Sequence, residues 1–293
     1  MQGSPASRLA RDLAAWLVVL AFVFPLFWWV LASVKPYTAI FAQPPVYVDF
    51  EATAENYAVT IGGQSRITLE GGVGGQTGGA SSYYSLPSIR DSLVVALGST
   101  ALALVLATLA SFGLSRFAMR AKDHVVFFVL AQRMLPPIAV AIPLFFIFRD
   151  LGLRDSHLGL ILAHTLINLP LAVLLLKSFF DDVPVELDES AMLDGATRFQ
   201  VFRMVVLPLV KGGLAATAVL CFIFSWTEFL ISLLLTTGIR TIPVKITTFV
   251  TSTGTEWGLI TALGSAALVP SFIFILLVQK HLVRGLTLGS LKS

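Results

Sequence analysis

Charged residues are scarce in this chain. Asp, Glu, Lys and Arg make up 13% of its 293 residues, whereas a soluble domain contains about 25%. Hydrophobic residues make up 56%, so the polar side chains are too few to cover a water-soluble globule of this size. This composition excludes a soluble enzyme. It also excludes a disordered chain, because 22 Phe and 5 Trp are too much apolar mass to remain in water.

Cysteine and the common catalytic motifs are also missing. The single Cys221 cannot form a disulfide within the chain. The sequence has no G-x-x-x-x-G-K-[ST] phosphate loop, no H-E-x-x-H zinc motif and no G-x-S-x-G nucleophile motif. Its histidines are scattered and form no ligand pattern. We therefore expect no catalytic residue, no metal site, no ATP hydrolysis by this chain alone and no nucleic-acid partner, and an intramembrane protease is disfavoured.

Long apolar runs are what the sequence does contain. Six of them are long enough to cross a bilayer, which takes about 20 residues. The first run follows Arg8 and Arg11 as in a signal peptide, but it exceeds the roughly 7–15 apolar residues of such a signal and is expected to be retained. The sequence thus predicts an all-α protein with six transmembrane helices. The runs are Leu13–Ser33, Leu93–Gly113, Val125–Phe148, Leu158–Leu176, Leu214–Leu235 and Gly258–Val278.

The positions of Lys and Arg indicate how these helices are oriented. Six spans place both termini on the same side of the membrane. If that side is the cytoplasm, twelve basic residues fall inside and seven outside. The short second loop, with Arg116, Arg120 and Lys122, gives the clearest indication, because cytoplasmic loops are enriched in basic residues. We therefore expect both termini to be cytoplasmic.

The segment after the first span, residues 34–92, is then external. It begins with turn residues such as Lys35-Pro36 and contains a glycine-rich tract at 70–80. The alternation in Arg66–Leu69 predicts a short strand. The segment is either a flexible loop or a small cap that touches an external partner. The expected organisation is a cytoplasmic N-terminus with the first helix (1–33), this segment (34–92), and a five-helix core (93–293) with a cytoplasmic loop at 177–213.

That cytoplasmic loop predicts two short helices. Pro184 suits the first turn of a helix, and the acidic residues after it lie where the helix dipole favours negative charge. Gly195 can end this helix, and Thr197 with Gln200 has the spacing of a capping box that starts a second one. The first helix is too short to span a membrane. The pair is either a docking element for a cytoplasmic protein or an interfacial connection, and its acidic character favours docking, since a lipid-surface helix would be basic.

The same loop resembles a known family. The run Glu189–Ala196, followed by Phe202 and Leu207-Pro208, is similar to the "EAA" loop of binding-protein-dependent ABC importers. The D-G-A form and the final Arg284–Thr287 are most similar to the carbohydrate permeases, of the type of the MalG inner-membrane subunit. The resemblance covers 86–293, and the first apolar run matches the first helix of the family. Ser190 replaces the middle alanine of the motif, and the external glycine-rich tract is not part of the family pattern.

The resemblance implies a heteromeric importer in the bacterial inner membrane. A second membrane permease subunit would complete the pathway through the lipid, an external solute-binding protein would deliver a carbohydrate or carbohydrate derivative, and an ABC ATPase dimer would use ATP and Mg while this chain binds no cofactor. The EAA loop would couple to that ATPase. Gly195→Asp is then expected to leave the protein inserted but abolish uptake. The expected coupling residues are Glu189, Ser190, Ala191, Asp194 and Gly195.

Polar residues inside the expected spans are candidates for a substrate path. A charged residue in a span costs about 2.5–3.5 kcal/mol on insertion scales, so it must face protein or water. Glu228 and Arg133 are of this kind. Together with an amide and an indole ring they suit a sugar, or else the two charges brace helices, for instance as a pair, or act in gating. The candidates for a path or gate are Gln132, Arg133, Asn168, Trp226 and Glu228.

Prolines predict irregular spans. Pro136-Pro137 with Pro143 should break or kink the third span, and Pro170 and Pro270 should do the same in the fourth and sixth. A secondary transporter or channel that works without an ATPase is the alternative function. Such proteins often contain internal repeats, and none is apparent between the two halves. The segment 189–208 favours the ATP-driven importer, because a self-contained carrier has no need of it.

Overall fold

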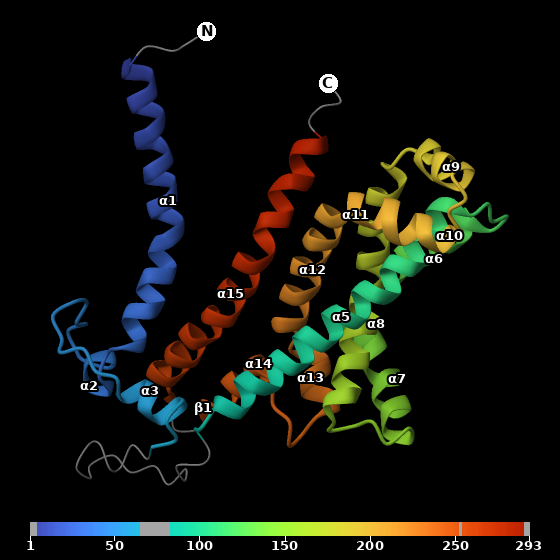
Figure 1. The fold of residues 1–293 in the computed structure, drawn as a ribbon. Coiled ribbons are helices and arrows are strands. Elements are labelled where there is room, and N and C mark those ends of the chain that lie inside the picture. Colours follow the sequence, from blue (N-terminus) through green and yellow to red (C-terminus); the bar gives the residue numbers. More distant parts are fainter. Residues whose placement is uncertain (1–4, 65–82, 252–253, 290–293) are drawn as a thin grey trace. The chain divides into compact units, whose positions relative to one another are not determined.

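A computed structural model describes residues 5–64, 83–251 and 254–289. The strand expected at Arg66–Leu69 and the glycine-rich tract at 70–80 lie outside the described residues. The described chain is mostly helical, and its course is drawn in Figure 1. It divides into two compact units, which we describe separately: unit 1 is Met1–Leu86 with Lys245–Leu268, and unit 2 is Pro87–Val244 with Val269–Ser293.

Unit 1 contains the first membrane helix and the segment that follows it. Asn56 is buried here, and its side-chain amide donates to the carbonyl oxygens of Ser33 (3.0 Å) and Lys35 (2.9 Å). These bonds fasten the third helix of the unit to the end of the first. The described elements are α1 (Pro5–Ser33), α2 (Tyr37–Ile40), α3 (Glu55–Thr60), the antiparallel pair β1 (Val250–Thr251) and β2 (Gly254–Thr255), and the beginning of α15 (Trp257–Gly289).

Lys35 holds the chain just beyond α1. Its ammonium group donates to the carbonyl oxygen of Val46 at 2.7 Å and lies 5.2 and 5.1 Å from the ring centres of Trp28 and Phe50. The residue is 7% exposed, and this burial lowers the pKa of Lys35 because the charged form loses its hydration. Lys35 thus ties the chain near Val46 and Phe50 to the end of α1.

Unit 2 carries the remaining membrane helices. Figure 1 shows α9 and α10 at one end of this unit and α7 and α13 at the other. Its elements are α5 (Leu86–Arg116), α6 (Lys122–Gln132), α7 (Pro137–Asp150), α8 (His157–Asp181), α9 (Val185–Leu193), α10 (Arg198–Gln200), the π-helix η2 (Val201–Val206), α11 (Leu207–Leu209), α12 (Lys211–Trp226), α13 (Leu230–Leu235) and α14 (Ile242–Thr247), followed by the remainder of α15.

Four helices of the described chain are long and apolar enough to cross a membrane: α1, α5, α8 and α15. Two bent helix pairs raise this number to as many as six if each pair is one span. In the first pair, α6 and α7 meet at 95° across Pro136-Pro137, where the sequence predicts a break. Pro170 and Pro270, in contrast, lie inside the continuous helices α8 and α15.

The fifth predicted span, Leu214–Leu235, is wrong as a single helix. The second bent pair consists of Arg198–Leu209 and Lys211–Trp226, which meet at 73°. Within the predicted span, α12 ends at Trp226, and a separate helix, α13, begins at Leu230. Here the Glu228 carboxylate accepts the backbone N–H groups of Ile231 (2.8 Å) and Ser232 (2.9 Å), which would otherwise lack partners at the start of a helix. A side chain therefore stabilises the interruption that hydropathy cannot reveal.

The core of unit 2 connects the membrane helices to the segment that follows α8. Buried side chains of α5, α8, η2 and α12 form one cluster, and Ala191 and Ala196 pack against its edge. Small residues on α5, such as Ala103 and Ala107, permit close helix approach. Helix α9 is therefore anchored in the same core that holds the membrane helices together.

Candidate functional site

Helix α9 begins and ends at the residues that the sequence predicts. Pro184 precedes its first residue, and Gly195 follows its end with a backbone φ of +88°. The N–H of Ala196 donates to the carbonyl oxygen of Ala191 at 3.0 Å, which closes the helix end. Nothing lies within 4 Å of a Cβ placed on Gly195. The glycine is therefore required by its left-handed backbone, and not by lack of space.

The second short helix starts with the predicted capping box. The N–H of Gln200 donates to Thr197 Oγ1 at 3.3 Å, and the N–H of Thr197 donates to Gln200 Oε1 at 2.7 Å. After Gln200 the chain continues as the π-helix η2 and not as a regular helix. The sequence does not predict this change of helix type. A π-helical stretch is rare and often occurs at functional sites.

One face of α9 is open. Glu186, Glu189 and Leu193 are spaced by three and four residues and are all exposed, with Leu193 at 89%. Asp188 is buried on the other side, and Ala191 is half-buried there. Of the predicted coupling residues, Glu189, Ser190, Asp194 and Gly195 are therefore exposed, and Ala191 packs inward.

The buried side of α9 is tied to α5 by an ion pair that the sequence does not predict. Arg116 Nε donates to Asp188 Oδ2 at 2.7 Å, and the two side chains are 5% and 8% exposed. The two residues are 72 positions apart, so no local pattern joins them. The available signal was an arginine at the end of an apolar span and an acidic residue on the inner face of a short helix.

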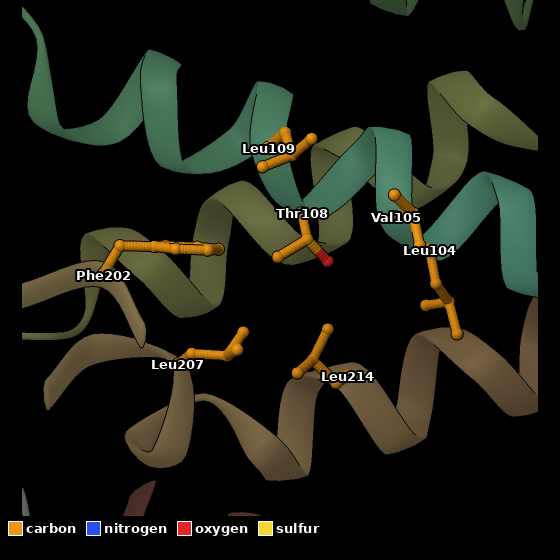
Figure 2. Close-up of a pocket in the computed structure, with 7 residues that line it drawn as sticks. All are labelled: Leu104, Val105, Thr108, Leu109, Phe202, Leu207 and Leu214. Atoms are coloured by element: carbon orange, nitrogen blue, oxygen red, sulfur yellow. The ribbon is translucent and has the colours of Figure 1, made fainter. Parts of the chain in front are cut away.

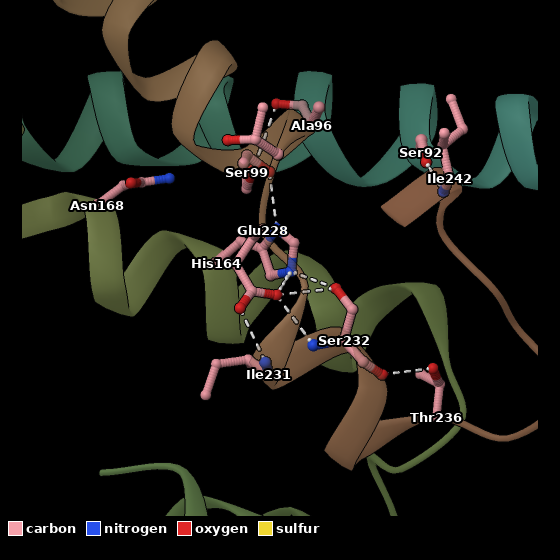
Figure 3. A network of polar contacts seen from close by, with 12 residues as sticks. Ser92, Ala96, Ser99, His164, Asn168, Glu228, Ile231, Ser232, Thr236 and Ile242 are labelled. Atoms are coloured by element: carbon pink, nitrogen blue, oxygen red, sulfur yellow. Dashed lines mark hydrogen bonds and ion pairs between the residues drawn. The ribbon is translucent and has the colours of Figure 1, made fainter. Parts of the chain in front are cut away.

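A second group of polar contacts lies between α5, α8, α12 and α13. His164 is 1% exposed. Its Nε2 is 3.1 Å from Ser232 Oγ and 3.4 Å from Glu228 Oε2 (Figure 3). Its Nδ1 is 2.7 Å from Ser225 Oγ, which in turn lies 2.9 Å from Ser99 Oγ. We call these five residues the His164 network.

Hydrogen-bond donors and acceptors in this network assign the proton on His164. An ionised carboxylate only accepts, so the Ser232 hydroxyl donates to Glu228 Oε2 at 3.0 Å. Because the Ser232 hydroxyl uses its proton in this bond, its contact with His164 Nε2 is a hydrogen bond only if Nε2 carries the proton and donates. On the other side, the hydroxyls of Ser225 and Ser99 can point either way, so Nδ1 finds a partner with or without a proton. Both ring nitrogens of His164 therefore have a hydrogen-bond partner in the network.

The structure does not bring the candidate path residues into one hydrogen-bonded cluster. Gln132 and Arg133 are exposed, and the Arg133 guanidinium lies 5.7 Å from the ring centre of Phe224. Glu228 Oε2 lies 3.4 Å from His164 Nε2, and the described residues show no ion pair between Glu228 and Arg133, so the alternative in which these two charges brace helices as a pair is not seen.

The other two candidate path residues are buried. The Asn168 side-chain amide donates to the carbonyl oxygen of Cys221 at 3.4 Å, which links α8 to α12. Trp226 stacks on Phe222 with ring centres 5.4 Å apart. Both therefore have partners within the helix packing, and Figure 3 shows Asn168 beside the His164 network.

An apolar groove of 340 Å³ lies between α5 and the segment from η2 to α12 (Figure 2). Thr108 is its one polar lining residue, so the groove offers almost no hydrogen bonds to a sugar. Its lining residues are Leu104, Val105, Thr108, Leu109, Phe202, Leu207 and Leu214.

Asp155 joins the loop after α7 to the loop after α13. Its carboxylate accepts the backbone N–H groups of Thr237, Gly238 and Ile239 at 2.9–3.1 Å. The bond from Ile239 is the main cause that lowers the pKa of Asp155, aided by those from Gly238 and Thr237 and opposed by partial desolvation. Its own φ is +52°, a backbone conformation that Asp tolerates better than most residues.

Comparison with known proteins places the chain in a family. Residues 103–288 match the family of binding-protein-dependent transport system inner membrane components. The chain is 31% identical, over the full length of both proteins, to the trehalose/maltose transport system permease protein MalG of Thermococcus litoralis. It is 30% identical to the sulfoquinovosyl glycerol transport system permease protein SmoH of Agrobacterium fabrum, over 97% of this chain and 93% of that protein.

A solved structure shows the same fold. A crystal structure of a bacterial ABC transporter involved in the import of the acidic polysaccharide alginate contains a chain that matches 96% of this one and 99% of its own length. The TM-score is 0.69 at 19% sequence identity. The multi-pass helical arrangement, the extent of the family match and the full-length relatives agree. The chain belongs to the family of binding-protein-dependent transport system inner membrane components.

Proposed function

We propose that this chain is one membrane-spanning subunit of an ATP-driven importer of a carbohydrate or carbohydrate derivative. It forms half of the pathway through the membrane and couples to a cytoplasmic ATPase through α9 and the helix that follows. Family membership supports the importer over the alternative of a secondary transporter or channel.

The single observation that carries the coupling role is the open face of α9. Leu193 is 89% exposed and Phe199, just beyond, is 65% exposed, so two large apolar side chains lie close together on this part of the loop. Glu186 and Glu189 lie beside Leu193 on that face. A protein partner with an apolar cleft and basic residues at its rim would cover both features, whereas an anionic lipid surface would repel the carboxylates.

The cargo is inferred from relatives. Proteins for trehalose or maltose and for sulfoquinovosyl glycerol match this chain over almost its whole length. All these cargoes are sugars or sugar derivatives. The particular sugar would be chosen together with the other components, since Asn168 and Glu228, two polar candidates in the spans, already have partners within this chain.

The remaining components follow from this role. A second membrane subunit would complete the pathway within the bacterial inner membrane and its lipid, and an external solute-binding protein would deliver the cargo. A pair of ATPases would bind ATP and Mg, while this chain holds no cofactor of its own. Both termini would lie on the cytoplasmic side with α9, in agreement with the distribution of Lys and Arg.

The test is a gentle detergent extraction of the protein from its native membrane, followed by mass spectrometry of the proteins that co-purify. We expect an ATPase and a second multi-pass membrane protein. The recovered complex, placed in liposomes with the binding protein, should take up sugar only when ATP is present on the α9 side. Isolation of the chain alone, still moving solute without ATP, would reject the proposal in favour of a secondary carrier.

A further inference from the structure

The Arg116–Asp188 pair joins a long membrane helix, α5, to the short helix α9. Arg116 is the last residue of α5, a membrane helix of 31 residues, and Asp188 lies in the first half of α9. The Nε–Oδ2 distance is 2.7 Å and both side chains are more than nine-tenths buried. Helix α9 is therefore attached to α5 directly, although α6, α7 and α8 separate them in the sequence.

The guanidinium group of Arg116 also holds the turn that leads into α9. Its second terminal nitrogen donates to the carbonyl oxygen of Val183 at 2.8 Å, and the first donates to Ser115 Oγ at 3.1 Å. Val183 lies between the end of α8 and the start of α9. Because the donors of a guanidinium are fixed in one plane, a single side chain sets the position of α5, the turn and α9 relative to one another.

Stability alone does not account for this arrangement. Replacing a buried ion pair by well-packed apolar residues is often neutral or stabilising. In addition, Asp188 Oδ1 is buried and accepts no hydrogen bond from the described residues, which carries a desolvation cost. An apolar contact would let the two helices slide, whereas an ion pair with defined donors keeps them in one register while either helix moves.

The pair also lies on the side of α9 that faces away from the open face. Glu186, Glu189 and Leu193 are exposed, and Asp188 between them points into the protein toward the end of α5. The ion pair is thus the contact through which a displacement of α9 would reach Arg116.

We propose that Arg116 and Asp188 are positioning residues that transmit movement of α9 to α5 during transport. This role rests on the proposed function, because it requires that an ATPase moves α9. In this role α5 is the membrane helix that is displaced when the ATPase acts. The ion pair is the link that makes α5 move whenever α9 moves.

The experiment uses the whole complex, purified through a tag on the ATPase so that only assembled complexes are measured. The quantity is sugar taken up per ATP hydrolysed in liposomes. The variants are Arg116→Gln, Asp188→Asn and the charge exchange Arg116→Asp with Asp188→Arg. Arg120→Gln is the matched control, since Arg120 is exposed in the same loop. We expect each single variant to lower uptake per ATP on the order of tenfold, the exchange to recover part of it and the control to match wild type.

Each outcome decides the proposal. Unchanged uptake per ATP in the assembled single variants would overturn it, even if fewer complexes assemble, because the pair would then serve stability alone. An equal loss in the single variants and in the exchange would also overturn it, since the effect would belong to the individual residues. Failure of the proposed function would be seen separately, in the wild type. Either no ATPase would co-purify with the wild-type chain, or that chain would take up sugar without ATP.

Discussion

His164 and Glu228 face each other inside unit 2, with Nε2 and Oε2 3.4 Å apart, and the Ser232 hydroxyl contacts both. Helix α8 supplies the histidine, and the interruption between α12 and α13 supplies the carboxylate. The two residues thus connect a continuous membrane helix to the point where another one stops.

Removal of the histidine should destabilise this connection. In His164→Ala, Ser225 and Ser232 lose buried partners and a cavity remains, so the free energy of unfolding should fall by about 1–3 kcal/mol. Thermal unfolding in detergent measures the effect as a lower midpoint. His124→Ala is the control, because His124 is exposed, and equal midpoints in the two variants would contradict the prediction.

Glu228→Gln separates the two roles that the sequence left open. Glu228 accepts N–H groups on both carboxylate oxygens, whereas an amide has only one acceptor oxygen. One N–H at the start of α13 then faces an NH₂ group, so stability should fall by about 1–3 kcal/mol with little change in the KM for sugar. A raised KM with unchanged thermal stability would instead assign Glu228 to the substrate path. Gln132→Ala serves as the comparison at an exposed candidate.

Gly195→Asp should leave the protein inserted but lower uptake strongly. A Cβ at position 195 meets nothing within 4 Å, so the only cost to the folded state is the strain of a left-handed backbone, about 1–2 kcal/mol. The new charge lies in the turn that follows α9. Gly195→Asn has nearly the same shape without the charge and should retain more uptake. Membrane content by immunoblot and sugar uptake are the measurements. Normal transport by the Asp variant would refute the coupling role of this turn.

Acid should loosen the loop contact made by Asp155. Because its pKa is lower in the folded than in the unfolded chain, its stabilising effect is present at neutral pH and is lost as the pH falls through the folded pKa. Hydrogen exchange of the amides of Thr237, Gly238 and Ile239, corrected for intrinsic rates, should therefore show protection that declines in acid. In Asp155→Asn the protection should be weaker and independent of pH. A wild type whose protection does not change on acidification would disprove this.

Local patterns predicted several features well. The capping box at Thr197 and the left-handed Gly195 depend on residues within a few positions of each other, so the sequence alone specifies them. The break at Pro136-Pro137 is equally local, since proline lacks the N–H that a helix needs.

Features that depend on distant partners escaped prediction. The interruption after Trp226 is stabilised by Glu228, whose partner His164 lies on another helix, and hydropathy alone extends the span through it. Asp188 reads as one of several acidic residues on a short helix until Arg116 is placed against it. The histidines form no motif in the sequence because the partners of His164 are serines, which carry no signal by themselves.

The 95° bend between α6 and α7 has a consequence for biogenesis. These helices have 11 and 14 residues, and a helix needs about 20 to cross the hydrocarbon layer. Neither helix is therefore long enough to insert into the membrane as a span by itself, whereas α5 and α8, on either side in the sequence, are. We expect α5 and α8 to integrate first, with the stretch between them completing its insertion only as the helices pack.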